Sequence, residues 1–488
     1  MNPAASTLPL LQTLRALLGA AQVLTHEDPS ADLSAYEQDW RRRHLGRALA
    51  VVRPGNTEEV AAVVRACAAA GASIVPQGGN TGLVVGSVPD ASGTQVVLSL
   101  QRMNRIRTLD AANLTLTLDA GCVLEAAQNA ADAAGLLLPL SLGSEGSCTI
   151  GGNLASNAGG TQVLRYGNAR ELCLGLEVVT PQGEIWSGLS GLRKDNTGYD
   201  LRQLYIGSEG TLGIITAATL KLQPRPRAQL TAWAAVPDPE AAVALLGLAH
   251  QYLGAGLSGF ELMGRFALGL VDKHYPQLRV PLWHDHPYCV LLENSDNEGE
   301  AHARARFEAL LELALEQGCV SDAVVAENLG QAKNLWHIRE SISLAQAEEG
   351  LNIKHDISLP VSAISPFCAE TDALLQCEVP GVRLVNFGHL GDGNLHYNVQ
   401  VPEHGDPKAF LREHEARINT LVFDAVTRHG GSISAEHGIG SLKAETLTHY
   451  KSPVALALMR RVKAALDPQN LMNPGRVLAD PAPTQETP

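Results

Sequence analysis

The first half of the chain alternates between short apolar runs and stretches in which apolar residues recur at helical spacing. Residues 50–75 read AVVRPGNTEEVAAVVRACAAAGASIV, which predicts a strand, a helix and a strand in a βαβ-like unit. Asn56 and Thr57 open the predicted helix, and acidic residues in its first turn suit the helix dipole. The pattern then predicts strands over 95–100 and 113–121, a helix over 123–134 and a hairpin over 174–186.

The pattern changes after residue 228, where strands and helices alternate more regularly. Strands are predicted over 231–237, 256–264 and 287–295, and helices over 238–253 and 299–318. This order favours an α+β domain with an antiparallel sheet. A helix over 334–350 and strands over 352–360 and 394–399 follow, and an amphipathic helix and a turn occupy 453–477.

The segment Gln223-Pro224-Arg225-Pro226-Arg227 is typical of a linker and marks the main domain boundary. Leucines at positions 8, 11, 14 and 18 predict a surface helix at the N-terminus, which has no basic region typical of a signal peptide. The predicted divisions are an N-terminal helical segment over 1–44, a first domain over 45–224, a second domain over 225–478 and a disordered tail over 479–488.

Composition narrows the class of protein. With 488 residues, 45% hydrophobic and 18% charged, the chain is globular and long enough for two or three domains. A net charge of -14 argues against a nucleic-acid partner. No run approaches about 18 uninterrupted apolar residues, so we expect no transmembrane helix. The eight cysteines form no CxxC pair, which predicts free thiols in a reducing, cytoplasmic compartment.

Two glycine-rich stretches suggest a bound ligand. In PQGGNTGLVVGS, Gly78, Gly79 and Gly82 let the backbone approach a ligand, and exposed backbone N–H groups suit phosphate oxygens. The signal is weak alone, because such loops are often only turns. The longer tract over 141–170 concentrates so much glycine, at an entropic cost, that we predict a backbone wrapped around an extended ligand.

A third cluster of motifs has the chemistry of a metal site. His389 and His396 lie seven apart in GHLGDGNLH, and Glu436 lies in SAEHG. Imidazole and carboxylate are ordinary ligands for zinc, and three protein ligands leave positions open for catalysis. A lone histidine is more often structural, and the chain has 16. Asp392 is interpreted as the polar residue of the GDGN turn rather than as a ligand.

Polar residues near these motifs are candidates for substrate binding. His396 and Asn398 alternate on one predicted strand, so they project from the same face. Glu436 and His437 are expected to point to opposite sides of extended backbone, so that His437 can act as a base. Further candidates are Arg339 and Ser343 on one helix face, and Lys354, Asp356 and Ser358 on one strand face. Alternatively, Arg339 and Lys354 pair with nearby acids such as Glu340 and Asp356.

Taken together, the motifs PQGGNTG, GSCTIGGNLASNAGG, RYG, RKDNTGYDL, GSEGTLGIIT, GHLGDGNLH, SAEHG and DPQNLMNPG resemble a known family. They are similar to those of the FAD-linked 2-hydroxyacid dehydrogenases in the vanillyl-alcohol oxidase/PCMH flavoprotein superfamily. The resemblance runs from about residue 35 to 477. It implies an α+β architecture with a two-lobed PCMH-type FAD-binding domain, a substrate or cap domain with an antiparallel sheet, and a last helix that packs back towards the FAD.

The resemblance also implies roles for individual residues. His389, His396 and Glu436 would bind one divalent metal, zinc or else manganese or cobalt. The substrate would meet Arg339, Ser343, Lys354, Asn398 and the catalytic base His437. No histidine or cysteine matches the covalent members, so the FAD would be non-covalent. Its contacts would be Pro76, Gly78, Gly79, Asn80, Thr81, Gly82, Leu142, Gly143, Gly146, Ser147, Ile150, Gly151, Gly152, Asn157, Ala158, Gly159, Gly160, Tyr166, Gly167, Glu209, Gly210, Gly213, Ile214 and Asn473.

Three residues depart from the pattern of the family. Ser343 stands where relatives often carry threonine, His355 where an aromatic residue is common, and Val85 where a glycine is often found. The first two put the identity of the substrate in some doubt. The third puts the local packing around the cofactor in doubt.

The implied reaction is oxidation of a D-2-hydroxy acid by proton abstraction and hydride transfer to FAD. Arg339 and Lys354 would suit a second carboxylate, which favours D-2-hydroxyglutarate; D-lactate or another monoacid is the alternative. Other readings are a non-catalytic flavin-binding subunit and a purely structural zinc site. The electron acceptor would be an electron-transfer flavoprotein, a quinone or a cytochrome, and relatives are often homodimers.

Overall fold

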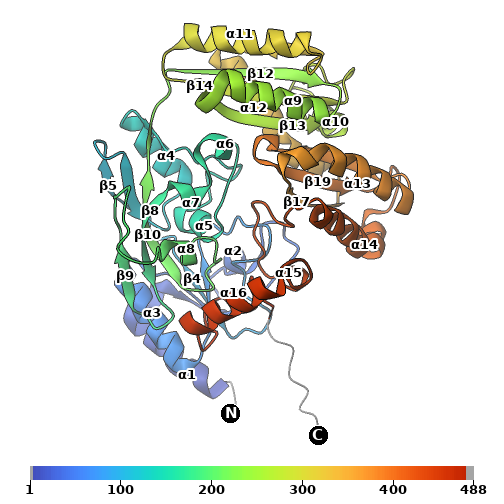
Figure 1. The fold of residues 1–488 in the computed structure, drawn as a ribbon. Coiled ribbons are helices and arrows are strands. Elements are labelled where there is room, and N and C mark those ends of the chain that lie inside the picture. Colours follow the sequence, from blue (N-terminus) through green and yellow to red (C-terminus); the bar gives the residue numbers. More distant parts are fainter. Residues whose placement is uncertain (1–3, 480–488) are drawn as a thin grey trace. The chain divides into compact units, whose positions relative to one another are not determined.

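The structure is a computed structural model that describes residues 4–479. These residues form two compact units (Figure 1). Unit 1 comprises residues 4–158, 168–224 and 437–479, and unit 2 comprises residues 159–167 and 225–436. The second domain, predicted over 225–478, is therefore divided at residue 437. The predicted disorder of residues 479–488 falls, from residue 480 on, outside the described part of the chain.

The first lobe of unit 1 is built on the predicted βαβ-like unit. Asn56 caps α3, because its side chain accepts the Glu59 N–H at 2.8 Å, and Gly71 ends the helix at φ 65°. The two flanking strands run parallel to β4, which lies between them, so this prediction is confirmed. The sheet order is β1(Val23–Leu24), β2(Ala48–Val52), β4(Gln95–Ser99) and β3(Ile74–Gln77), with α3(Thr57–Ala70) as the crossover.

The second lobe of unit 1 is an antiparallel sheet of five strands. The predicted hairpin is present, with Gly183 at φ 76° in its turn. The predicted helix over 123–134 is also present, one residue shorter at each end. In sheet order the strands are β5(Ile106–Asp110), β6(Thr115–Asp119), β10(Ile214–Lys221), β8(Cys173–Val179) and β9(Ile185–Gly188), and the helix is α4(Leu124–Ala133).

The long glycine tract, predicted to wrap around an extended ligand, contains short helices. In α5(Ile150–Ala155), a Cβ on Gly151 would lie 2.7 Å from the Cβ of Ala120, so glycine allows the helix to pack closely. The other short elements of unit 1 are α1(Ala4–Leu18), η1(Ala20–Gln22), α2(Ser34–Glu37), a two-stranded sheet of β7(Leu136–Leu137) and β11(Gln223–Pro224), α7(Ala169–Leu172) and α8(Arg202–Tyr205).

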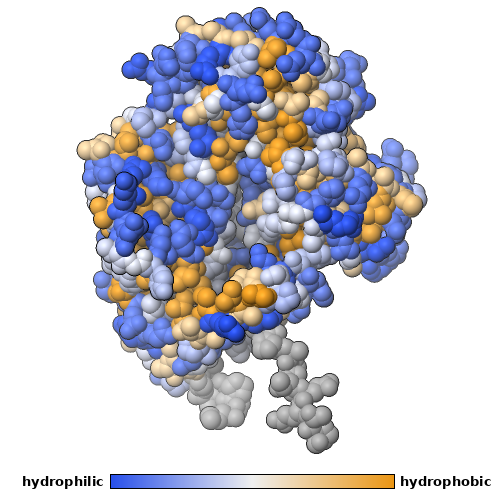
Figure 2. All heavy atoms as spheres, viewed as in Figure 1, coloured by the Kyte–Doolittle hydropathy of each residue, from blue (hydrophilic) through white to orange (hydrophobic). Residues whose placement is uncertain are grey.

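The C-terminal segment of unit 1 completes the first lobe. The Ile74 N–H donates to the Leu471 carbonyl and the Asn473 N–H donates to the Ile74 carbonyl, each at 2.8 Å. Two helices precede this contact, α15(Ala444–Tyr450) and α16(Pro453–Leu466). Figure 2 shows apolar side chains over α16, where Val454 and Leu458 are 71% and 53% exposed.

Unit 2 contains one antiparallel sheet, as the alternation after residue 228 predicts. Helices α10(Arg265–His274) and α12(Leu329–Glu348) contribute to a core in which Trp233, Ile338 and Phe387 are buried. The sheet order is β15(Asp322–Val325), β12(Ala228–Val236), β14(Tyr288–Asp296), β13(Leu257–Gly264), β18(Arg383–Gly388), β19(Asn394–Gln400) and β16(Asn352–Ile353), with β17(Asp356–Ser358) also on β19. The helices are α6(Val163–Tyr166), α9(Pro239–Leu253), η2(Gly254–Gly256), α10(Arg265–His274), α11(Glu300–Glu316), α12(Leu329–Glu348), η3(Val361–Ala363), α13(Ile364–Glu378), η4(Leu390–Asp392) and α14(Pro407–Arg428).

The predicted single strand over 352–360 is interrupted between β16 and β17. His355 lies at the interruption and is 1% exposed. Its backbone N–H donates to Asn398 Oδ1 at 2.9 Å, and its Nδ1 lies 2.8 Å from the Tyr397 carbonyl. The Tyr397 N–H still donates to the His355 carbonyl at 3.0 Å, but the His355 N–H bonds to a side chain, and Lys354 and Asp356 do not belong to one continuous strand.

The structure also bears on the predictions about the cysteines and about transmembrane helices. All eight cysteines are free thiols, and most are buried. Within residues 4–479, none of the helices combines the length and apolar character that a membrane crossing needs.

Candidate active site

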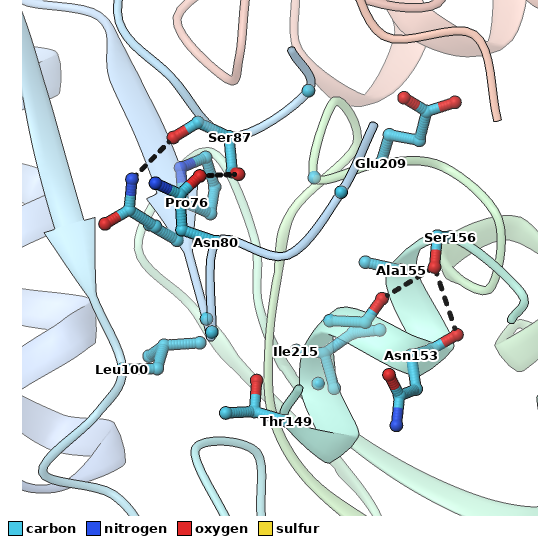
Figure 3. Close-up of a pocket in the computed structure, with 18 of the residues that line it drawn as sticks. Pro76, Asn80, Ser87, Leu100, Thr149, Asn153, Ala155, Ser156, Glu209 and Ile215 are labelled. Atoms are coloured by element: carbon cyan, nitrogen blue, oxygen red, sulfur yellow. Dashed lines mark hydrogen bonds between the residues drawn. The ribbon is translucent and has the colours of Figure 1, made fainter. Parts of the chain in front are cut away.

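A pocket in unit 1 lies between the first glycine loop, helix α5 and the glycine loop before β10. The space inside it, including the open solvent at its mouth, is about 930 Å³. Figure 3 shows Asn80 and Ser87 on one side of the pocket and Thr149, Asn153 and Ser156 on the other. The lining residues are Pro76, Gln77, Gly78, Gly79, Asn80, Thr81, Gly82, Val84, Gly86, Ser87, Leu100, Cys148, Thr149, Gly151, Gly152, Asn153, Ala155, Ser156, Ser208, Glu209, Gly210, Gly213, Ile214, Ile215 and His437.

The walls of this pocket combine closely packed glycine backbone with polar atoms that a ligand could bind. A Cβ on Gly79 would lie 2.1 Å from the Ser147 carbonyl oxygen, so the loop is held tightly against the tract. Thr149 Oγ1 and Asn153 Nδ2 are buried and have no hydrogen-bond partner among the described residues. Buried polar atoms are normally paired, so both are available to a ligand. These features fit FAD.

Half of the residues predicted to contact FAD line this pocket. They include all six from the first glycine loop, two from α5 and four from the 209–214 loop. Four others belong to unit 2, namely Gly159, Gly160, Tyr166 and Gly167. The predicted residues of unit 1 that lie outside the lining are Leu142, Gly143, Gly146, Ser147, Ile150, Asn157, Ala158 and Asn473. Polar lining residues such as Gln77, Thr149, Asn153 and Ser208 are absent from the predicted set, although each lies within one of the quoted glycine-rich motifs.

Glu209 ties the pocket to the segment that carries the predicted base. Its two carboxylate oxygens accept the N–H groups of Ile439 and Gly440, at 2.8 and 2.7 Å. Asn473 Nδ2 donates to the carbonyls of Gly86 and Glu209, at 2.8 and 2.7 Å. Two residues shortly after His437 are thus held by the side chain of Glu209, and His437 itself lines the pocket.

The three predicted metal ligands come together in unit 2. Ligand atoms of His389, His396 and Glu436 all lie within 4.8 Å of one another, and His389 Nε2 is 3.4 Å from Glu436 Oε1. His389 follows β18, in a turn where Asp392 Oδ1 accepts the Asn394 N–H at 3.2 Å, and His396 lies on β19. The predicted turn role of Asp392 is therefore confirmed, and two imidazoles with one carboxylate match the ligand preferences of zinc.

Buried carboxylates make this cluster attractive to a cation. Burial, together with Asp356 and Asp392, raises the pKa of Glu436 to about 7. Burial also raises the pKa of Asp392 to about 6. Burial would lower the pKa of His389, but Glu261 and Glu436 raise it to about 9. A divalent metal would relieve the repulsion among these carboxylates, so the cluster fits one.

Asp356 positions Glu436. It is 2% exposed, and its Oδ2 accepts the Glu436 N–H at 2.9 Å, while Oδ1 accepts from Asn394 Nδ2 at 3.0 Å. The same Oδ1 is 3.9 Å from Nδ1 of His396. The chain bends at residues 435–437, so the expected extended backbone at Glu436 and His437 is not observed.

Arg339 forms an ion pair, but with neither of the two acids considered from the sequence. Its Nε donates to Glu261 Oε2 at 2.8 Å, and the other oxygen of Glu261 lies 2.7 Å from Nδ1 of His389. Burial would raise the pKa of Glu261, but the charges of His389 and Arg339 lower it to about 2. Sequence reasoning missed Glu261, although a lone acid within the apolar run FELMG is a signal of a buried, paired charge.

The remaining predicted substrate residues differ in their surroundings. Ser343 lies on the exposed surface of α12, whereas Arg339, one turn earlier, is 6% exposed. Lys354 is half-buried at the interruption between β16 and β17. Asn398 is buried, and its Nδ2 donates to Gln346 Oε1 at 2.9 Å while its Oδ1 accepts the His355 N–H. Both ends of the Asn398 amide therefore support the protein itself.

Comparison with known sequences assigns families to both parts of the chain. The FAD binding domain family matches residues 48–188. The family of C-terminal domains of FAD linked oxidases matches residues 225–477, which is more than half of the chain.

Similar proteins support the same assignment. A D-2-hydroxyglutarate dehydrogenase of Xanthomonas citri is 42% identical over 94% of this chain and 95% of its own length. The mitochondrial D-2-hydroxyglutarate dehydrogenase of Arabidopsis thaliana is 39% identical over 91% of this chain and 78% of its own length. The crystal structure of p-cresol methylhydroxylase with substrate bound superposes with a TM-score of 0.76 at 17% identity, covering 98% of this chain and 97% of that one. The predicted PCMH-type fold is thereby confirmed.

Proposed function

Because this chain belongs to the family of FAD-linked oxidases, and is therefore an FAD-dependent oxidoreductase, we propose that it oxidises D-2-hydroxyglutarate to 2-oxoglutarate. The observation that carries the proposal is the position of Arg339. Glu261 bonds to both Arg339 and His389, so a cation able to bind a carboxylate lies beside the predicted metal ligands. A dicarboxylate can use both, whereas a monoacid such as D-lactate needs only one.

In the proposed reaction His389, His396 and Glu436 would hold a divalent metal, which would supply a Lewis acid for the substrate hydroxyl. His437 takes the hydroxyl proton on its imidazole. His437 directly follows Glu436 in the sequence, so the proposed base is adjacent along the chain to a proposed metal ligand. The glycine loops and Thr149 hold FAD, which accepts the hydride when bound. Lys354 and Ser343 are proposed as further contacts to the substrate.

Four finer statements belong to the proposal. The metal is zinc, with manganese or cobalt as alternatives. The electron acceptor is an electron-transfer flavoprotein, a quinone or a cytochrome. The protein acts in the cytoplasm, where its free thiols stay reduced. It forms a homodimer.

Anaerobic reduction of the bound flavin tests the function directly. The purified holoenzyme is mixed with D- and L-2-hydroxy acids, and bleaching of the flavin absorbance is followed with and without pretreatment by a chelator. We expect fast bleaching by D-2-hydroxyglutarate, slower bleaching by D-lactate and loss of both after chelation. Bleaching by D-lactate at least as fast would reject the dicarboxylate substrate, and no bleaching by any acid would reject the dehydrogenase.

A further inference from the structure

Glu261 occupies the centre of strand β13, between the apolar residues Phe260 and Leu262, and is 1% exposed. A carboxylate so far from water is stable only if charged partners and hydrogen bonds replace its hydration. Both of its oxygens have such a partner. Oε1 lies 2.7 Å from His389 Nδ1, and Oε2 accepts from Arg339 Nε at 2.8 Å and lies 2.7 Å from its Nη2.

The contact with His389 determines which ring nitrogen is free. A carboxylate beside Nδ1 favours the tautomer in which Nδ1 carries the proton, because the ionised oxygen can only accept. Nε2 is then left as the ligand atom, and it is the nitrogen that lies 3.4 Å from Glu436 Oε1. A carboxylate behind a ligating histidine is a common way to fix ring orientation and strengthen metal binding.

The contact with Arg339 fixes the plane of the guanidinium. One edge of the group faces Glu261, and its central carbon lies 5.1 Å from the ring centroid of Phe387. Nε and Nη2 both face Glu261 Oε2, at 2.8 and 2.7 Å, which leaves the other N–H groups of the guanidinium outside this ion pair. The group is therefore anchored on one side and retains N–H donors for a carboxylate.

We propose that Glu261 is a positioning residue that couples the two halves of the substrate site. With one oxygen it orients His389 towards the metal, and with the other it presents Arg339 to the second carboxylate of the substrate. This inference rests on the proposed function, because it requires both a metal and a dicarboxylic substrate. Its consequence is that loss of the Glu261 charge weakens metal binding and the preference for the dicarboxylate together.

The test compares Glu261→Gln with Glu293→Gln, a matched control. Glu293 lies on the neighbouring strand β14, is 8% exposed, and bonds to Ser258, Trp336 and Gln229 rather than to a predicted metal ligand. Metal affinity is measured by competition with a chromogenic chelator. We expect zinc to bind Glu261→Gln about 10–100-fold more weakly. We also expect its kcat/KM ratio for D-2-hydroxyglutarate over D-lactate to fall by about tenfold. Glu293→Gln should change neither quantity.

Two outcomes would overturn the inference. The first is a folded Glu261→Gln protein with the zinc affinity of the parent. The second is weaker zinc binding with an unchanged substrate ratio, which would limit Glu261 to His389. If the variant does not fold, nitrogen NMR of ¹⁵N-histidine in the zinc-loaded parent still decides, because a protonated His389 Nε2 contradicts the proposed tautomer. A parent protein that binds no zinc, or oxidises no D-2-hydroxy acid, would instead reject the proposed function.

Discussion

Val85 illustrates how one residue can carry backbone strain next to a cofactor pocket. It has φ 58°, in the left-handed region that favours glycine, and it is β-branched. Its neighbours Val84 and Gly86 line the pocket. Val85 is also one of the positions at which the sequence departs from the family pattern, since relatives often carry glycine there. The departure and the strain therefore coincide.

Because of this strain, replacement by glycine should lower the free energy of unfolding less at Val85 than at the adjacent Val84. Val85→Gly loses a buried side chain but relieves the left-handed conformation, which costs about 1–2 kcal/mol for a residue with a Cβ. Val84→Gly, at a residue equally buried and without positive φ, loses its side chain with no such relief. We expect Val85→Gly to cost about 1–2 kcal/mol less, as measured by urea unfolding of the two variants. Equal costs would show that Val85 is not strained.

At the scale of elements, local patterns predicted structure wherever local interactions decide it. Helix α3 has a side-chain cap and a glycine stop within its own sequence, and the predicted boundaries follow them. Helix α5 depends on the approach of Gly151 to Ala120, which no local pattern reveals. The interruption at His355 depends on Tyr397 and Asn398, about 40 residues later in the chain, so the predicted continuous strand was wrong.

The candidate site was predictable to the extent that motifs mark it. His389, His396 and Glu436 were predicted from short glycine-flanked motifs, and unit 2 brings them together. Glu261 and Asp356, which support them, could be assigned no such role from the sequence, because their partners come from other strands and loops. The roles of Thr149 and Asn153 were also not predictable from the sequence, because only the fold places their polar groups against the first glycine loop.

The close approach of Gly79 to the Ser147 carbonyl leads to a prediction for FAD binding. In Gly79→Ala the new methyl group would lie 2.1 Å from a backbone oxygen, so the loop must move, at a cost of about 1–3 kcal/mol. We expect this variant to lose most of its FAD during gel filtration. Gly247→Ala, in helix α9, is the control, because its Cβ meets nothing within 4 Å and it is not a predicted FAD contact, so this variant should retain FAD. Equal retention in both variants would contradict the tight packing.

For the whole molecule, stability in acid should depend on Glu349 in unit 2. Burial would raise the pKa of this carboxyl, but bonds from Lys273, His274 and Arg383 lower it to about 2 from 4.5. A lowered pKa contributes stability that is fully present above the unfolded value and is lost as pH falls towards 2. Partial exposure of Lys273 screens part of the effect.

We therefore expect Glu349→Gln to lower the free energy of unfolding by about 1–3 kcal/mol at pH 7. The difference from the parent should shrink as pH falls from about 4.5 towards 2. Urea unfolding at pH 7 and pH 3 measures it. Glu370→Gln is the control, because that carboxylate pairs with Arg428 and His429 but is 44% exposed, and it should cost less than about 1 kcal/mol. A constant difference at both pH values would exclude Glu349 as the cause.

The division of unit 1 along the chain has a consequence for synthesis. Ile74 on β3 cannot form its hydrogen bonds with Leu471 and Asn473 until those residues have been synthesised. Likewise, Glu209 cannot accept the N–H groups of residues 439 and 440 before these have been synthesised. All of unit 2 between residues 225 and 436 is translated in the interval, which takes roughly 10–40 s at ordinary ribosome speeds. During that time the glycine loops lack the segment that closes them. Stable capture of the flavin therefore becomes one of the last events in the maturation of each new molecule.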